Sequence, residues 1–426
     1  SAASDVYKRQ ECFLDKEGNW DWDKQEGQRW MLQAARERGV RYSLGFSITA
    51  PYFMTKNGMA RASEKTPYAN IREDQFDDYA AFLAEVSTHL KLDYLSPINE
   101  PQWEWVGSEQ EGMQATNMEC SRLIHLLDKE LQQRNSVTKV VFGEAADIRY
   151  LYRSATDKPE RDNQLEEIFS KEGAYSIYGL SSVAPVVSGH SYWSTWPVDT
   201  LVQTRKELAE ELRKQLPSDY TYWQTEYCPM EQNPDNPRGG GGRDLSMNTA
   251  LYVARVIHHD LTVANASSWQ WWTAFSEWDY KDGLIFIDDG TLANGASRGD
   301  EKMIETCKQD GVFRTSKLLW TLGNYSFFIR PGMVRLSSVT NTDNMAEIMA
   351  SAYADNSLKR IVVVLVNSSR EDKMIDLSFQ SLPAGYCVQK YKLYETSARS
   401  DLQYKGIVGS QLLIPARSVV TLVGVE

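Results

Sequence analysis

Between residues 26 and about 330, short apolar segments alternate with longer amphipathic segments, and this alternation limits the possible folds more than any other feature of the chain. In segment 73–90, apolar residues recur at the spacing of a single helix face. They are Phe76, Tyr79, Ala80, Leu83 and Val86. Alternation of strands and amphipathic helices is typical of a parallel sheet whose strands are joined by helices. We therefore expect an α/β domain.

The pattern predicts six strands and six helices in this part of the chain. The strands are expected at 42–48, 94–98, 139–142, 186–190, 220–224 and 267–272. The helices are expected at 28–38, 73–90, 117–134, 200–215, 247–264 and 315–320. A closed (β/α)8 barrel of the TIM type has eight such strand–helix units. We therefore expect a barrel that lacks its first two strands, in a chain whose native part begins near residue 11.

The pattern changes after about residue 322. Runs such as RIVVVLV and SVVTLVGV alternate with turn-like segments such as PAG and PARS. Short strands separated by turn residues are typical of an antiparallel β-sandwich. The sequence thus predicts two domains, a barrel over 11–321 and a C-terminal β-sandwich over 322–426.

Charge and composition exclude several classes of partner. The formal net charge of −12 opposes binding to a nucleic-acid backbone. No apolar run approaches the ~18 residues that a membrane helix needs. The five cysteines are scattered along the chain, without the spacing of a zinc site or a disulfide framework. The sequence also lacks a dinucleotide fingerprint and a serine nucleophile elbow.

Glu100 is the first candidate catalytic residue. In the segment SPINEPQWEW, the apolar strand ends just before Asn99 and Glu100, and Pro101 stops further strand pairing because it has no backbone donor. Trp103 and Trp105 flank the glutamate. A carboxyl group among apolar rings tends to stay protonated near neutral pH, which a general acid requires.

Glu226, in YWQTEYCPM, is the second candidate, because it also follows a strand at its carboxyl end. The carboxyl ends of parallel strands meet at one edge, so we expect Glu100 and Glu226 to face the same cleft. Two carboxyl groups about 5–5.5 Å apart can hydrolyse a glycoside with retention, one protonating the leaving oxygen while the other attacks the anomeric carbon. The structural alternative is that each glutamate caps a loop or pairs with an arginine.

Two further strand ends carry aromatic side chains. The segment SGHSYWSTWP places His190, Tyr192 and Trp193 at the same rim. The tyrosine hydroxyl or a histidine nitrogen there could hydrogen-bond the nucleophile, although a buried histidine is often only structural. In SSWQWWTAF, Trp269, Trp271 and Trp272 alternate with polar residues, so the three cannot all face the core. At least one tryptophan of this segment is expected to form the floor of a sugar site.

Three other features carry weaker functional signals. Glu144, in FGEAAD, ends another strand and could bind a substrate hydroxyl. The glycine-rich segment PDNPRGGGGRD follows the strand that ends at Glu226, and it is either a mobile surface loop or a flap over the cleft. The sequence His258-His259-Asp260 lies in an expected helix and is interpreted as a surface or packing feature.

With these residues in view, the chain resembles glycoside hydrolase family 30. Asn99-Glu100-Pro101 matches the family's acid/base motif after barrel strand four, and Glu226 matches its nucleophile at the end of strand seven. If 94–98 is the fourth strand, the expected strands place Glu226 at the seventh. FIRPG, YETSARSDL and PARSVVTLV resemble the family's β-sandwich. FSITAPYFMTKNG departs from the usual third-strand loop, which affects the prediction of substrate contacts.

The resemblance implies a retaining endo-glycosidase with Glu100 as acid/base, Glu226 as nucleophile, Asn99 on the sugar 2-hydroxyl, and no cofactor or metal. The SPINEPQWEW version is most similar to endo-β-1,6-galactanases, which implies β-1,6-galactan of arabinogalactan side chains as the substrate. Relatives acting on β-1,6-glucan or glucuronoxylan leave those substrates open, and a non-catalytic carbohydrate-binding protein is the alternative outside the enzymes. Other expected substrate contacts are Trp103, His190, Tyr192, Trp193, Trp271 and Trp272. We expect a secreted or periplasmic monomer whose partner is a polysaccharide or oligosaccharide.

Overall fold

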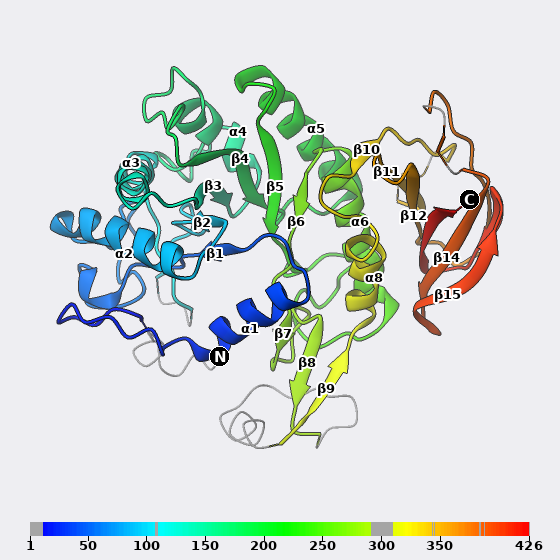
Figure 1. The fold of residues 1–426 in the computed structure, drawn as a ribbon, viewed down its shortest axis with the longest axis horizontal. Helices are drawn as coiled ribbons and strands as arrows, with labels where there is room; N and C mark the ends of the chain where they lie inside the picture. Colours follow the sequence, from blue (N-terminus) through cyan, green and yellow to red (C-terminus); the bar gives the residue numbers. More distant parts are fainter. Residues whose placement is uncertain are drawn as a thin grey trace.

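The computed structural model describes residues 12–106, 110–290, 310–342, 344, 346–382, 385–386 and 388–425. Its centre is a parallel sheet with strand order β1-β2-β3-β4-β5-β6 (Figure 1). The strands are β1 (Leu44–Phe46), β2 (Tyr94–Ser96), β3 (Lys139–Ala145), β4 (Val183–His190), β5 (Thr221–Glu226) and β6 (Ser268–Trp269). Each strand lies beside the next one in sequence, which is the topology of a TIM-like domain. The six parallel strands expected from the sequence are confirmed, and within the described residues the parallel sheet has these six.

The helices that join the strands also lie close to their expected positions. They are α1 (Glu26–Glu37), α2 (Phe76–His89), α3 (Asn117–Gln133), α5 (Val198–Gln215) and α6 (Met247–Thr262). The start of α3 is set by a capping box, in which the side chains of Thr116 and Glu119 each bond the other residue's backbone N–H. The apolar faces of α2 and α3 pack into one core with the inner strands. In the described part of the chain, no helix combines the length and apolar character needed to span a membrane.

Several short elements were not expected from the sequence. They are η2 (Tyr52–Met54), α4 (Arg149–Tyr152), η4 (Leu165–Phe169), β7 (Phe275–Ser276), β8 (Ile285–Asp288) and β9 (Val312–Thr315), whereas η3 (Glu73–Gln75) forms the start of the helix expected over 73–90. The strands β7, β8 and β9 form a separate small sheet at the bottom of Figure 1. Asp288 of β8 accepts hydrogen bonds from Arg243 and Arg314, each at 2.9 Å, and so ties this sheet to the loop before α6.

The C-terminal part is all-β, as expected, and follows α8 (Lys317–Ser326). Its strands are β10 (Val334–Leu336), β11 (Ile348–Asp355), β12 (Arg360–Asn367), β13 (Lys373–Asp376), β14 (Lys390–Ser397), β15 (Ser400–Val408), β16 (Gln411–Ile414) and β17 (Ser418–Val425). Six of them form an antiparallel sheet in the order β10-β11-β12-β17-β14-β15, and β13 pairs with β16. Side chains of β16 share a core with one face of the large sheet, while α6 packs against the other face. The boundary expected after residue 321 lies within α8, so the division at that residue stays a prediction.

Two adjacent histidines on α6 predict that the fold loses stability in acid. Burial lowers the pKa of His258 to about 3 and the pKa of His259 to about 4, and Arg335 of β10 further disfavours a charge on His258. The unfolded chain binds these protons near a pKa of about 6.5. Their contribution to stability is therefore complete above that pH and is lost as the pH falls through the folded values. We expect the Tm to decrease over this window.

The double variant His258→Gln/His259→Gln tests this expectation by thermal unfolding between pH 7 and about pH 4.5. Each histidine that must be neutral in the fold lowers the free energy of unfolding by up to about 1.4 kcal/mol per pH unit. The double variant should therefore show a shallower decrease in Tm than the parent. His125→Gln, at an exposed position of α3, is the matched control and should keep the parent slope. An unchanged slope in the double variant would assign the acid sensitivity to other groups.

Candidate active site

Glu100 and Glu226 meet at the carboxyl-terminal edge of the parallel sheet. Glu226 is the last residue of β5, and Glu100 lies just beyond β2. One carboxylate oxygen of each lies within 4.8 Å of the other. This separation is near the ~5–5.5 Å of retaining glycosidases and below the ~6.5 Å at which inverting ones begin. Only 9% of the Glu100 side chain and 13% of the Glu226 side chain are exposed, so the pair is enclosed but reachable from solvent.

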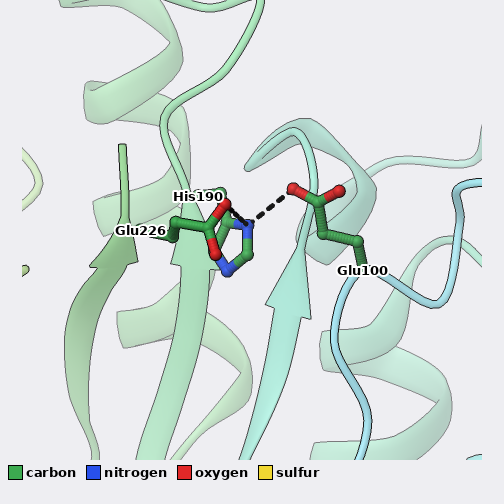
Figure 2. Close-up of side chains that lie close together, drawn as sticks. All are labelled: Glu100, His190 and Glu226. Carbon is green, nitrogen blue, oxygen red and sulfur yellow. Dashed lines mark hydrogen bonds and ion pairs between the residues drawn. The ribbon is translucent and has the colours of Figure 1, made fainter. Parts of the chain in front are cut away.

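His190, the last residue of β4, lies between the two carboxylates (Figure 2). Its Nδ1 is 2.8 Å from Oε1 of Glu100 and 3.9 Å from Oε1 of Glu226. Its Nε2 is 3.0 Å from Oε2 of Glu144. Burial alone lowers the pKa of His190, but the carboxylates of Glu226, Glu100 and Glu144 together raise it well above its usual value. The three carboxylates around the buried imidazole therefore favour its protonated form.

Tyr192 fixes the other side of Glu226. Its hydroxyl donates a hydrogen bond of 2.9 Å to Oε1 of Glu226. Burial raises the pKa of Glu226 to about 7, the charge of His190 opposes this effect, and the neighbouring Glu100 adds to it. Burial also raises the pKa of Tyr192 well above its usual value, so its hydroxyl stays a donor. Tyr192 and His190 both favour the ionised form of Glu226, which is the form that the predicted role of nucleophile requires.

Backbone irregularities aim these side chains into the site. The pairing register of β3 with β4 shifts next to Glu144, and that of β4 with β5 shifts next to His190. Such bulges redirect side chains and are frequent beside active sites. Glu100 and Glu144 have φ angles of 46° and 40°, in the left-handed region that non-glycine residues rarely adopt. The backbone N–H of Glu100 donates to the carbonyl of Glu144 at 3.0 Å, which ties the two strand ends together.

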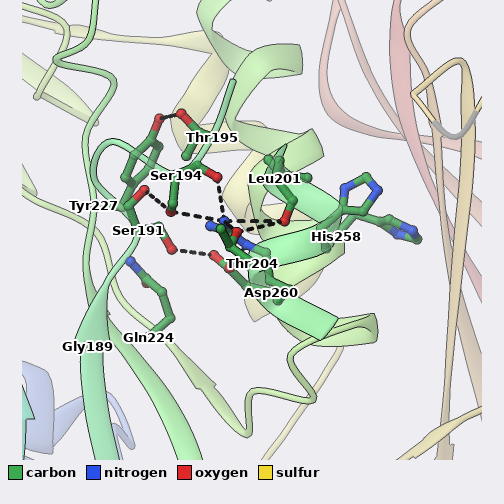
Figure 3. A network of polar contacts seen from close by, with 12 residues as sticks. Gly189, Ser191, Ser194, Thr195, Leu201, Thr204, Gln224, Tyr227, His258 and Asp260 are labelled. Carbon is green, nitrogen blue, oxygen red and sulfur yellow. Dashed lines mark hydrogen bonds and ion pairs between the residues drawn. The ribbon is translucent and has the colours of Figure 1, made fainter. Parts of the chain in front are cut away.

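A buried ion pair supports the loop that follows His190. Arg205 of α5 donates to Asp260 of α6 at 2.8 Å and to the carbonyl of Ser194 at 2.6 Å, and neither charged side chain is exposed. The other Asp260 oxygen accepts from the Ser191 hydroxyl at 3.0 Å (Figure 3). It also accepts from the Trp269 indole at 2.9 Å. This network holds the loop that carries Tyr192. The interpretation of His258-His259-Asp260 as a packing feature is confirmed.

The structure changes the interpretation of Glu144. The sequence suggested that it could bind a substrate hydroxyl, but its side chain is fully buried beneath His190. Its Oε2 accepts from the hydroxyl of Thr225 at 2.5 Å as well as facing Nε2 of His190. The sequence indicated only that Glu144 ends a strand. The burial of its side chain depends on the register shift in β3, which the sequence does not reveal. Among the described residues the side chain of Glu144 contacts His190 and Thr225, and a substrate contact by Glu144 stays a prediction.

The arrangement of Glu100, His190 and Glu226 raises the question of which group supplies a positive charge between the two carboxylates. Glu100, His190 and Glu226 could bracket a cation, because one ligand atom from each lies within 4.8 Å of the others. Nδ1 of His190, however, already lies at hydrogen-bond distance from Glu100. A protonated imidazole at this position would supply the positive charge that stabilises two adjacent carboxylates.

The sequence and the fold were compared with known proteins. The family model described as O-Glycosyl hydrolase family 30 matches residues 1–286, which include both glutamates and all six parallel strands. This chain belongs to O-glycosyl hydrolase family 30. Over 124 residues it is 26% identical to an endo-beta-1,6-galactanase of Hypocrea rufa. The aligned region covers 27% of this chain and only 26% of that relative.

Solved structures agree with the family membership. A conserved exported protein from Bacteroides fragilis is 35% identical, with a TM-score of 0.87 over 99% of this chain and 84% of that one. The catalytic domain of xylanase C from Talaromyces cellulolyticus is 19% identical, with a TM-score of 0.65 over 96% of this chain and 82% of that one. The xylanase Xyn30A from Clostridium acetobutylicum is 17% identical, with a TM-score of 0.61 over 95% of this chain and 85% of that one. The two xylanases establish a shared fold.

Two of the predicted substrate-binding tryptophans form a partly exposed pair at the site's rim. Trp103 and Trp193 stack with ring centroids 5.2 Å apart and planes 12° apart. They expose 43% and 40% of their surfaces. Trp103 follows Glu100 on the same loop, and Trp193 follows Tyr192, so the pair lies next to both catalytic candidates. A family 30 enzyme can use such apolar faces to stack on a sugar ring, and this contact stays a prediction.

Replacing Trp103 by alanine is expected to raise KM about tenfold with a smaller effect on kcat. The lost apolar contact is worth on the order of 1.5 kcal/mol, which corresponds to about one order of magnitude in affinity. Initial rates over a range of polysaccharide concentrations measure both constants. Trp30→Ala is the matched control, because Trp30 is 63% exposed on α1. A change confined to kcat would indicate that Trp103 orients Glu100 instead of binding sugar.

The remaining predicted substrate-binding residues differ in their hydrogen bonding and packing. Oδ1 of Asn99 is buried and has no hydrogen-bond partner among the described residues. The indole of Trp271 donates to the carbonyl of Asp282 and packs against Tyr227. Trp272 lines a separate cavity of about 600 Å³ beside β1 and α2. Sugar binding by Asn99, Trp271 and Trp272 stays a prediction, as does direct sugar contact by the buried His190 and Tyr192.

The glycine-rich loop after β5 is pinned to the segment before β8. The ammonium of Lys281 donates to Oδ1 of Asn236 at 2.6 Å and to the carbonyl of Gly239 at 2.7 Å. The ring of Tyr280 fills the space that a Cβ at Gly240 would need, so this position requires glycine. The role of this loop as a flap over the cleft stays a prediction.

Proposed function

We propose that this protein is a retaining glycoside hydrolase in which Glu100 is the general acid/base and Glu226 is the nucleophile. The observation that carries the proposal is the separation of at most 4.8 Å between one oxygen of each carboxylate. This distance leaves room for the anomeric carbon but not for a water molecule placed beside it, as an inverting enzyme requires.

In the first step, Glu226 attacks the anomeric carbon while Glu100 donates a proton to the glycosidic oxygen, so that the carbon–oxygen bond of the leaving group breaks. The hydroxyl of Tyr192, 2.9 Å from Oε1 of Glu226, keeps the nucleophile oriented. Asn99 lies next to Glu100 with a free amide oxygen, which suits a bond to the sugar 2-hydroxyl.

In the second step, Glu100 removes a proton from water, the water attacks the anomeric carbon, and the bond to Glu226 breaks. Glu100 is protonated and Glu226 is ionised again, as they were before the first step, and the configuration at the anomeric carbon is retained. These steps use only the chain's own carboxyl groups and water.

The substrate we propose is β-1,6-galactan, cleaved internally, as in arabinogalactan side chains. The local similarity to an endo-beta-1,6-galactanase over 124 residues supports this choice. β-1,6-Glucan and glucuronoxylan are the alternatives within the family. Outside the enzymes, a carbohydrate-binding protein without activity is the alternative.

We further propose an exported protein, secreted or periplasmic, that acts as a monomer, with its C-terminal sheets packed as a β-sandwich. The similarity to a conserved exported protein from Bacteroides fragilis supports export. The core that β16 shares with the large sheet supports the sandwich.

Reducing-sugar release from β-1,6-galactan, β-1,6-glucan and glucuronoxylan tests the function. The panel is run on the parent and on the variants Glu100→Gln and Glu226→Gln, and NMR during the parent reaction records the anomer formed first. Release from one polysaccharide, lost in both variants and giving the retained anomer, supports the proposal. Glycan binding without hydrolysis by a cooperatively folded parent would favour the binding protein, and an inverted first product would exclude the mechanism.

A further inference from the structure

A third buried carboxylate lies directly beneath the catalytic pair and has no role in the steps above. Glu144 is fully buried, and its Oε2 accepts a hydrogen bond of 2.5 Å from Thr225 and faces Nε2 of His190 at 3.0 Å. An ionised carboxylate oxygen only accepts hydrogen bonds. While Glu144 is ionised, its contact with Nε2 of His190 therefore requires a proton on that nitrogen.

The opposite nitrogen of the same ring faces the catalytic pair. Nδ1 of His190 lies 2.8 Å from Glu100 and 3.9 Å from Glu226. The ionisable groups that face His190 are therefore Glu100 from the end of β2, Glu144 from β3 and Glu226 from β5, with the ring of Tyr192 edge-on at 6.0 Å. Three carboxylates surround one imidazole that is entirely excluded from water.

We propose that Glu144 is a positioning residue that keeps His190 doubly protonated, so that the imidazolium serves the two catalytic carboxylates in turn. This inference rests on the proposed roles of Glu100 and Glu226. Before attack, Glu226 is ionised and Glu100 carries the proton. After attack, Glu226 is an ester and Glu100 is ionised. The negative charge moves from one neighbour of Nδ1 to the other, while the charge of the whole group, including Glu144 and His190, stays constant.

The backbone holds Glu144 in place for this role. The bulge in β3 directs its side chain inward, and its φ of 40° is a strained conformation for a residue other than glycine. Its backbone N–H donates to the hydroxyl of Ser188 at 3.1 Å, and its carbonyl accepts from Glu100 at 3.0 Å. The same residue thus positions the acid/base through its backbone and the histidine through its side chain. If burial alone positioned these groups, Glu144 would not need its left-handed backbone conformation.

The test is ¹⁵N NMR of the full chain labelled at histidine, with the His190 signals assigned by their absence in His190→Asn. In the parent, both ring nitrogens of His190 should be protonated at pH 8, where an ordinary histidine is neutral. In Glu144→Gln, the His190 midpoint should fall by roughly one to three pH units, because one adjacent negative charge is lost. Glu104→Gln is the matched control, because Glu104 pairs with Lys158 and Arg161 instead of His190, and its His190 signals should not move.

Kinetics supply the second readout. Glu144→Gln should lower kcat on the order of tenfold to a hundredfold at neutral pH, less than the ~10²–10⁴-fold contribution of a general acid/base itself, with KM little changed. Thr225→Val removes a hydrogen bond to Glu144 and should lower the His190 midpoint by a smaller amount than Glu144→Gln does. It also serves as the second variant if Glu144→Gln does not fold.

A neutral His190 in the parent at pH 8, or a His190 midpoint that does not fall in Glu144→Gln, overturns the inference. These results separate it from the proposed function, because the NMR readout needs no substrate. If a polysaccharide is cleaved but the His190 midpoint is unchanged in Glu144→Gln, only the inference fails. If the His190 midpoint falls in Glu144→Gln but no polysaccharide is cleaved by the parent, the proposed function fails instead.

Discussion

Replacing Glu226 by glutamine is expected to lower turnover by roughly four to six orders of magnitude, as the loss of a nucleophile does in other enzymes. An amide cannot form the glycosyl ester, and it also removes the negative charge that faces the positively charged transition state. Glutamine has nearly the same shape, and its carbonyl oxygen can still accept the bond from Tyr192. Stopped assays with a substrate of the parent, run over days, measure the residual rate. Glu210→Gln, at an exposed position of α5, is the matched control and should leave the rate unchanged.

The same variant should not lose stability. Since burial raises the pKa of Glu226 to about 7, the folded state holds this proton more tightly than the unfolded chain does. The parent therefore loses stability as the pH rises from about 4.5 through 7, and glutamine removes that loss. We expect the Tm of Glu226→Gln to equal or exceed that of the parent at pH 8. Activity within tenfold of the parent in a folded Glu226→Gln would remove Glu226 from the role of nucleophile.

The parallel sheet and its helices could be predicted because their signals are local. The apolar face of α3 and its capping box at Thr116 and Glu119 are both readable within one segment. The positions of Glu100 and Glu226 follow from the same reasoning, since a side chain at a strand's carboxyl end lies at the active edge of such a sheet. The short β7–β9 sheet was not predicted, because its three strands are only two to four residues long and carry little periodicity.

The connection between Glu144 and the catalytic pair could not be predicted. It requires the register shifts beside Glu144 and His190, and a shift of one residue moves a side chain to the opposite face of the sheet. The tryptophans after β6 present the same difficulty. Their alternation in sequence indicates that they face different ways, but only the tertiary packing places Trp271 against Tyr227 and Trp272 in a separate cavity.

The support beneath the site leads to the largest expected effect on stability. Arg205→Met removes the partner of Asp260, and both side chains are completely buried. Breaking a buried pair by removing one member typically costs about 3–5 kcal/mol, because the other charge stays in a medium of low polarity. Arg205 also bonds the carbonyl of Ser194, so the loop that carries Tyr192 should loosen. We therefore expect a large decrease in the urea midpoint together with a lower kcat.

A double-mutant cycle with Asp260→Asn separates the ion pair from the packing around it. The asparagine can still accept hydrogen bonds from Ser191 and Trp269 without leaving a buried negative charge. Arg205→Met/Asp260→Asn should therefore lose less free energy of unfolding than the sum of the two single variants. Arg213→Met, at an exposed position of the same helix, is the control and should change stability by less than about 0.5 kcal/mol. Additive losses of the free energy of unfolding in the cycle would mean that Arg205 stabilises the loop through Ser194 alone. The active-site strand ends would then not depend on the ion pair between Arg205 and Asp260.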